Sequence, residues 1–172
     1  MSEKIQVKIP ETAVVKAAGE GMDAFVALFI KAIKEAVGGE LNAETMQKLN
    51  ADQITLWGYA IVHEEVMDGG FIQLIQNGYG PFIFLNPFAK ALRLWGLKDL
   101  QKLIYKGRKL FEEHQEALTA DLSDEEFMAL YEQYPQFDDL DDEFIVEEAN
   151  YTEAIATYID EHIEQFADIV KS

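Results

Sequence analysis

The sequence predicts an all-α fold, arranged as a single compact multi-helix domain. Three observations lead to this prediction. Apolar residues recur at three- and four-residue steps through almost the whole chain, which places them on one face of a helix. No stretch of useful length alternates apolar and polar residues as a half-buried strand would. The chain has 172 residues, 49% of them hydrophobic, which is enough to bury one ordinary core.

Eight helices are expected along the chain, at 22–37, 51–67, 71–76, 87–95, 99–114, 124–134, 141–149 and 151–170. Residues 1–21 precede them as an N-terminal arm or a short helix, because Pro10 and the glycines at 19 and 21 permit either. The domain itself is expected to span 22–172, with an acidic C-terminal third at 112–172.

Polar residues mark where several of these helices begin. Three pairs have the spacing of a capping box, in which two side chains bind each other's backbone N–H groups. These pairs are Asn50 with Gln53, Ser123 with Glu126, and Asn150 with Glu153. Asn86 followed by Pro87 has the pattern of an N-cap and a first helical residue.

Glycine and proline mark where the helices end. Gly38, Gly96 and Pro135 each follow the last apolar residue of a helical stripe. The cluster at 77–81 is expected to be a turn. Gly107 lies on the buried face of the helix at 99–114, which indicates close contact with a neighbouring helix.

Charge is concentrated at one end of the chain. The acidic C-terminal third holds 20 of the 32 carboxylates and one of the 14 Lys and Arg residues, a net charge of −19. The first 111 residues hold 12 carboxylates and 13 Lys and Arg residues, a net charge of +1. Aromatic residues continue through the acidic third, and a disordered acidic tail would be poor in them. We therefore expect the acidic third to be folded.

We interpret the acidic third as a partner-binding surface. Its candidate residues are a run of carboxylates and a second set expected on the outer face of the last helix. They are Asp138, Asp139, Asp141, Asp142 and Glu143 in the run, and Glu153, Asp160, Glu161, Glu164 and Asp168 on the helix. Five charges spread over 15 helical steps give one charge per roughly 4–5 Å, close to the ~3.4 Å between phosphates along a DNA strand.

Two other interpretations of the acidic residues stay open. An acidic face can serve only to keep a protein solvated. It can also be neutralised by the basic stretch of the preceding helices, within one chain or between two copies. That stretch contains Lys90, Arg93, Lys98, Lys102, Lys106, Arg108 and Lys109. The same stretch has a spacing that suits phosphate, but the net charge of −18 opposes direct binding of nucleic acid.

No sequence pattern indicates an enzyme, a metal site or a cofactor. The absence of cysteine excludes disulfides and thiolate metal sites. The segment from His63 to Met67 lacks the second histidine of a zinc-protease helix, and the acidic run lacks the ligand spacing of an EF-hand. An alternative function is a soluble helical domain of unknown role. It would have a small pocket near His63 and the Gly69-Gly70-Phe71 turn, with Glu64 or Glu65 beside the histidine.

A distinctive motif lies between Trp57 and Asn77. It reads Glu65-Val66-Met67-Asp68-Gly69-Gly70-Phe71, followed by Gln73-Leu74-Ile75-Gln76-Asn77. These residues resemble the bacterial DNA-mimic protein family, which has a Glu-Val-x-Asn-Gly-Gly-Phe turn and a Gln-aromatic-aromatic-x-Asn helix. Here Asp68 replaces Asn, and Leu74-Ile75 replace the aromatic pair. The similarity extends more loosely over roughly 50–166.

The motif itself is interpreted as structural. Asp68 tolerates the geometry of a turn, and Gly69 and Gly70 allow positive φ between two helices. Phe71 is expected to enter the core. None of this chemistry touches DNA, and the resemblance assigns no binding role to these four residues.

The resemblance implies an all-helical, often dimeric protein. The best-known family member is understood to occupy the DNA-binding face of a transcription factor with its acidic surface and so to relieve repression. The partner implied here is a basic DNA-binding protein, bound without a cofactor by a homodimer. The start of the chain lacks a signal-peptide pattern, and its apolar stretches are far shorter than the ~20 residues that span a bilayer. A cytoplasmic location with no membrane contact is expected.

Overall fold

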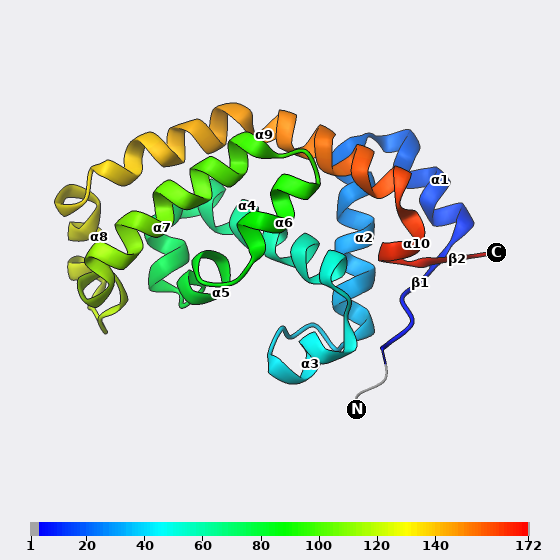
Figure 1. Ribbon diagram of the computed structural model, residues 1–172, viewed down its shortest axis with the longest axis horizontal. Helices are drawn as coiled ribbons and strands as arrows, with labels where there is room; N and C mark the ends of the chain where they lie inside the picture. The colour runs from blue at the N-terminus through cyan, green and yellow to red at the C-terminus, as the bar shows by residue number, and fades with distance from the viewer. Residues whose placement is uncertain (1–3, 172) are drawn as a thin grey trace. The chain divides into compact units, whose positions relative to one another are not determined.

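The all-α fold class is confirmed. The computed structural model describes residues 4–171, which are largely helical and also contain a short pair of strands (Figure 1). The helices in this part of the chain are α1 Glu11–Glu20, α2 Met22–Ala36, α3 Ala43–Lys48, α4 Ala51–Gln76, α5 Gly80–Phe84, α6 Phe88–Leu94, α7 Lys98–Thr119, α8 Asp124–Gln133, α9 Gln136–Glu161 and α10 Ile163–Phe166. The strands are β1 Lys8–Pro10 and β2 Asp168–Val170.

The chain divides into two compact units. Unit 1 contains the described residues up to Trp57 and those from Asn150 onward, and unit 2 contains Gly58–Ala149. The boundaries fall within α4 and within α9, so each of these two helices contributes one part to each unit.

Unit 1 contains a small sheet that the sequence did not predict. β1 and β2 pair in parallel with Ile9 opposite Ile169, and Figure 1 shows the two strands side by side. Each strand has three residues, too few for an alternating pattern to be visible. In the N-terminal segment, β1 is followed directly by α1. Residues 1–3 of that segment lie outside the described residues.

The last two predicted helices are wrong in their boundaries. One continuous helix, α9, replaces the predicted break at Asn150, so Asn150 and Glu153 lie inside a helix and do not cap one. The physical reason is that no glycine or proline occurs in 136–161 and the apolar spacing continues unbroken. The predicted helix at 151–170 ends early, because α9 stops at Glu161 and the chain continues as α10 and β2.

The other two predicted capping boxes are confirmed. Asn50 and Gln53 bind each other's backbone N–H groups at 2.8 and 3.0 Å, as do Ser123 and Glu126 at 3.2 and 3.1 Å. In unit 1 the first pair also reaches α10. Asn50 Nδ2 donates to the carbonyl of Gln165 at 2.7 Å, and Gln53 Nε2 donates to that of Phe166 at 3.0 Å. These bonds tie the start of α4 to the end of the chain.

Unit 2 is built around buried aromatic rings. Phe84 lies between Phe71 and Phe111, with ring centroids 6.2 and 5.4 Å apart. Gly107 marks a close helix contact as predicted, since a Cβ there would lie 2.8 Å from the Phe84 ring. The predicted turn at 77–81 overlaps a short helix that the sequence analysis missed, α5, which packs with α6 and α7 (Figure 1).

Candidate functional site

Most of the predicted binding residues face solvent. Nine of the ten are exposed: Asp138, Asp139, Asp142, Glu143, Glu153, Asp160, Glu161, Glu164 and Asp168. Exposure leaves these carboxylates hydrated and accessible to a partner. The tenth, Asp141, is partly buried and makes contacts inside unit 2.

In unit 2 the exposed carboxylates lie on the first half of α9. Residues 136–149 contain seven carboxylates and no Lys or Arg. Four of the seven are exposed, Asp138, Asp139, Asp142 and Glu143, which over 14 residues is one exposed carboxylate per ~5 Å of helix, compared with ~3.4 Å between phosphates of one DNA strand. The preceding helix, α8, adds exposed carboxylates at Asp124, Glu125 and Glu132. These three residues belong to the acidic third but were not among the predicted site residues.

In unit 1 the predicted residues do not share one helix. Glu153, Asp160 and Glu161 lie on α9, whereas Glu164 is in α10 and Asp168 begins β2. The predicted row of five charges on one helical face is therefore wrong, although all five side chains are exposed. The single row does not form because α9 ends at Glu161 and the chain continues as the short helix α10 and the strand β2.

Direct ion pairs do not neutralise the nine exposed binding residues. Within residues 4–171, none of the nine forms an ion pair. In unit 2 the basic stretch contributes one pair in that range, in which Arg108 Nε lies 2.6 Å from Glu112 Oε1 on the same helix. Lys98, Lys102 and Lys106 are exposed. The ion pairs within unit 2 therefore give little support to the interpretation that the basic stretch neutralises the acidic residues.

Asp141 caps a helix from outside it. α4 is interrupted at Gly70, whose φ of 80° and ψ of −177° are not helical, so a new N-terminus begins at Phe71. Asp141 Oδ1 accepts a hydrogen bond from the Phe71 backbone N at 2.8 Å. A first-turn N–H group has no partner within its own helix, and a carboxylate is a favoured acceptor for it. We therefore leave Asp141 out of the proposed binding surface.

The position of Asp141 changes its acidity. Burial raises the pKa of the Asp141 carboxyl to about 6, although the hydrogen bond from Phe71 opposes this shift and the charges of Asp138 and Asp142 add to it. The pKa of the nearby Tyr131 is raised as well. Burial raises the pKa of its hydroxyl, and the negative charges of Asp141 and Asp68 contribute. This corner of unit 2 thus disfavours negative charge.

The Gly-Gly-Phe motif forms the interruption that Asp141 caps. Gly70 has positive φ as predicted, and a Cβ there would collide with the Asp141 carboxylate. Gly69 does not have the positive φ that we expected; it remains helical, and its carbonyl oxygen accepts a hydrogen bond from the Tyr131 hydroxyl at 2.7 Å. Phe71 is fully buried, as predicted.

The polar residues of the motif connect the two halves of α4. Glu65 Oε2 accepts hydrogen bonds from Gln73 Nε2 at 2.8 Å and from Asn77 Nδ2 at 2.9 Å. Asp68 Oδ2 accepts a further bond from Gln73 Nε2 at 2.9 Å. The motif therefore stabilises a kinked helix, which agrees with its structural interpretation.

His63, the centre of the alternative function, has a structural environment in unit 2. Its Nε2 lies 2.8 Å from Glu148 Oε1, and its ring packs with the rings of Tyr59 and Phe144. Glu65 is occupied by Gln73 and Asn77, while Glu64 is exposed. These contacts account for His63 without an acid–base role.

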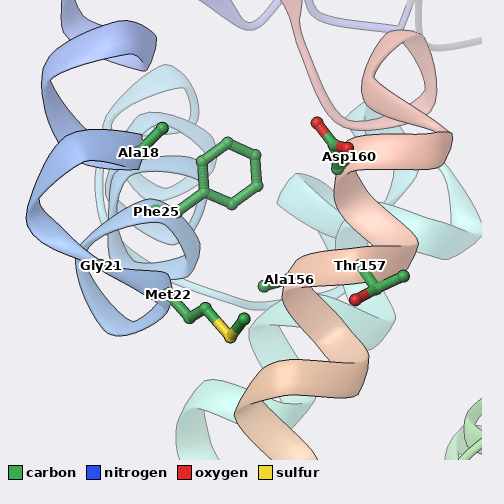
Figure 2. A pocket seen from close by; sticks show the side chains of 7 residues that line it. All are labelled: Ala18, Gly21, Met22, Phe25, Ala156, Thr157 and Asp160. Carbon is green, nitrogen blue, oxygen red and sulfur yellow. The ribbon is translucent and has the colours of Figure 1, made fainter.

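Unit 1 contains the following two cavities among those of residues 4–171. The first has a volume of about 230 Å³ and lies between the α1–α2 junction and the C-terminal half of α9 (Figure 2). Its lining residues are Ala18, Gly21, Met22, Phe25, Ala156, Thr157 and Asp160. The second, of about 470 Å³, is lined by Glu11, Thr12, Val15, Lys16 and Lys171. Among the predicted binding residues, Asp160 lines the first cavity.

The remaining titratable groups form no metal site in the described chain. Within residues 4–171, no group of three or more His, Cys, Asp or Glu side chains is placed to hold a metal ion. The same residues include no helix long and apolar enough to cross a membrane. His162 has a structural position, because its Nδ1 donates to the carbonyl of Tyr158 at 2.9 Å and its ring stacks on that residue.

Comparison with known proteins gives two matches. A family model described as DMP19-like protein matches residues 47–162, which include all of unit 2 and the whole of α4 and α9. The DNA mimic protein DMP19 of Neisseria meningitidis serogroup B (strain ATCC BAA-335 / MC58) is 34% identical over 128 residues, covering 73% of this chain and 77% of that protein.

Proposed function

Because this chain belongs to the DMP19-like protein family, we propose that it acts as a DNA mimic. In this role its exposed carboxylates occupy the DNA-binding face of a basic protein and exclude DNA from it. The proposed surface consists of Asp138, Asp139, Asp142 and Glu143 in unit 2, and Glu153, Asp160, Glu161, Glu164 and Asp168 in unit 1.

The observation that carries this proposal is the absence of direct compensation. In residues 4–171 these nine carboxylates are exposed and form no ion pair. A DNA-binding face presents Lys and Arg where phosphates lie, and much of its affinity comes from those contacts. Exposed carboxylates can pair with the same cations, which is the physical basis of competition with DNA.

The proposal also specifies the partner, the oligomeric state and the cellular location. The partner is a transcription factor or another basic DNA-binding protein, and the chain acts as a homodimer in the cytoplasm. It binds without a cofactor, without catalysing a reaction and without contacting nucleic acid itself, because its net charge of −18 repels phosphates.

The test starts with a partner captured from the native lysate at low salt. The purified partner is bound to a labelled DNA duplex, and this protein is titrated into the complex. We expect it to displace the DNA, with an affinity that falls steeply as salt increases, because screening weakens interactions between exposed charges. Binding that does not depend on salt, or binding that leaves the DNA in place, would contradict the proposal.

A pair of charge-matched variants separates a local surface from net charge. The first replaces Asp138, Asp139 and Asp142 with Asn and Glu143 with Gln. The second replaces four exposed glutamates outside the surface, Glu11, Glu40, Glu44 and Glu64, with Gln. At about 0.2–1 kcal/mol per exposed pair, we expect the first variant to bind about fourfold to several hundredfold more weakly. The second should stay near wild type, and equal losses would indicate a non-specific charge effect.

A further inference from the structure

The cavity of about 230 Å³ in unit 1 has apolar walls and a carboxylate at its edge. Met22 and Phe25 extend from α2 toward α9, and Asp160 lies on the α9 side, across from the Phe25 ring (Figure 2). Phe25 is 8% exposed, so its ring is held in place, whereas Met22 is 50% exposed and can adjust to a ligand. The site thus combines a fixed aromatic wall, a flexible apolar wall and one negative charge.

The size of the cavity limits what it can hold. Sites for drug-sized molecules have volumes of about 300–1,000 Å³. A volume of about 230 Å³ is smaller, and it suits one inserted side chain better than a cofactor. Backbone at Gly21 forms part of the lining, and open space lies where a Cβ at that glycine would point.

The charge of the site selects a cationic side chain. Asp160 is exposed and forms no ion pair within residues 4–171. Lysine and arginine bury their aliphatic stems against apolar surfaces while keeping the charged group at the rim. Arginine fits better than lysine, because a guanidinium group is planar, stacks on an aromatic face and binds a carboxylate through two N–H groups.

We propose that this cavity is an anchor site for one arginine side chain of the partner protein. The stem lies against Ala18, Met22 and Ala156, and the guanidinium group stacks on Phe25 and pairs with Asp160. The inference rests on the proposed function, since a DNA-binding face is a surface rich in arginine. It adds an apolar contact that a purely electrostatic surface does not provide.

The family match does not predict this site. The α1–α2 wall of the cavity lies outside the matched residues 47–162, whereas Asp160 lies inside them. The anchor therefore combines an acidic residue of the matched region with a segment that lies outside that region.

A peptide titration tests the anchor without DNA or a partner protein. The full chain, labelled with ¹³C at methionine and alanine methyl groups, is titrated at low salt with Ac-Gly-Arg-Gly-NH₂, and the signals of Met22 and Ala18 are followed. We expect saturable shifts of these signals. The lysine peptide should bind about two- to fivefold more weakly because it loses the stacking contribution. An equal response to the lysine peptide or to a leucine peptide would overturn the assignment to arginine.

Three variants complete the test. Ala18→Leu fills the cavity without changing charge, and we expect the peptide response of Met22 to weaken at least tenfold. Asp160→Asn should weaken it about fivefold, as for a partly exposed ion pair. Ala27→Leu adds the same bulk at an exposed position of α2 outside the cavity and should leave binding unchanged. Wild-type binding in both Ala18→Leu and Asp160→Asn would overturn the proposal.

The peptide result and the DNA-displacement result are independent. Displacement of DNA with no response at Met22 would overturn the anchor and leave the proposed function intact. A response at Met22 without displacement of DNA would overturn the proposed function, and with it the assignment of the arginine to a DNA-binding face.

Discussion

Replacing Asp141 with asparagine should stabilise unit 2 at neutral pH. Asparagine keeps an Oδ1 atom that accepts the hydrogen bond from the Phe71 N–H group, but it removes a charge that lies partly buried near Asp138 and Asp142. The helix cap is thus retained while the unfavourable charge is lost. Alanine at the same position removes the charge and the acceptor together, so it should be about 0.5–2 kcal/mol less stable than the asparagine variant, the usual cost of losing a cap.

The magnitude follows from the acidity of Asp141. Its pKa is raised from 3.8 to about 6. A difference of about two pKa units is worth at most about 3 kcal/mol. Because Asp141 is only partly buried, solvent screening lowers this figure, and we expect about 1–2 kcal/mol.

The sign of the pH dependence follows from proton binding. A raised pKa means that the folded state holds a proton which the unfolded state releases between about pH 4 and pH 6. The contribution of Asp141 to the free energy of unfolding therefore falls as pH rises through this window. The advantage of Asp141→Asn should be largest near pH 7.5 and about half as large near pH 5.

The assay is urea unfolding of each variant at pH 5 and pH 7.5. A Trp57→Phe background leaves Trp95, which lies in unit 2, as the only indole. Asp142→Asn is the matched control, because it removes the same charge from an exposed neighbour that makes no ion pair in the described chain. Its effect should stay within about 0.5 kcal/mol. If Asp141→Asn is no more stable than Asp141→Ala at pH 7.5, the role assigned to Asp141 is refuted.

Three further predictions concern the kink, a cap and the basic stretch. Gly70→Ala should destabilise unit 2 by about 1–3 kcal/mol or more, because the backbone there has positive φ and the new Cβ would collide with Asp141. Gly78→Ala is the control: the backbone at Gly78 also has positive φ, but no atom lies near the new Cβ, so the variant should lose less unfolding free energy in the same urea assay. Ser123→Ala should cost about 1 kcal/mol of unfolding free energy by removing the cap of α8, and an unchanged urea midpoint would contradict the capping role. Replacing Lys98, Lys102 and Lys106 together with Gln should leave partner affinity within about twofold, because these side chains form no ion pair in residues 4–171; a large gain in affinity on titration calorimetry would indicate that the basic stretch had been neutralising the acidic surface.

Local patterns in the sequence were enough to predict the elements whose stabilising contacts are themselves local. The capping boxes at Asn50–Gln53 and Ser123–Glu126 depend on side chains three residues apart, so their spacing is visible directly. The positive φ of Gly70 and the burial of Phe71 follow in the same way from glycine's freedom and an adjacent apolar ring.

Features that depend on distant contacts were not predictable. β1 and β2 come from opposite ends of the chain, and nothing in three residues indicates such a partner. Asp141 had the same appearance as the acidic residues around it, but it caps Phe71 from 70 residues away. Asparagine is a favoured N-cap residue, yet Asn150 lies within α9, because the apolar spacing on both sides favours one continuous helix.

The candidate site was only partly predictable for the same reason. Counting carboxylates located the acidic third, and exposure of nine of the ten chosen residues agrees with it. The predicted shared helical face was wrong, because the prediction assumed one helix that continued past Glu161. The cavity beside Asp160 depends on a contact between segments at the two ends of unit 1, and no sequence signal reports that contact.

The most direct test of the central claim is whether the partner can hold DNA and this protein at the same time. Partner, labelled duplex and this protein with a second label are mixed at low salt, and the complexes are resolved by analytical ultracentrifugation with separate detection of the two labels. We expect two exclusive complexes, partner with DNA and partner with this protein, whose proportions follow the two concentrations. A stable complex that contains all three would contradict it.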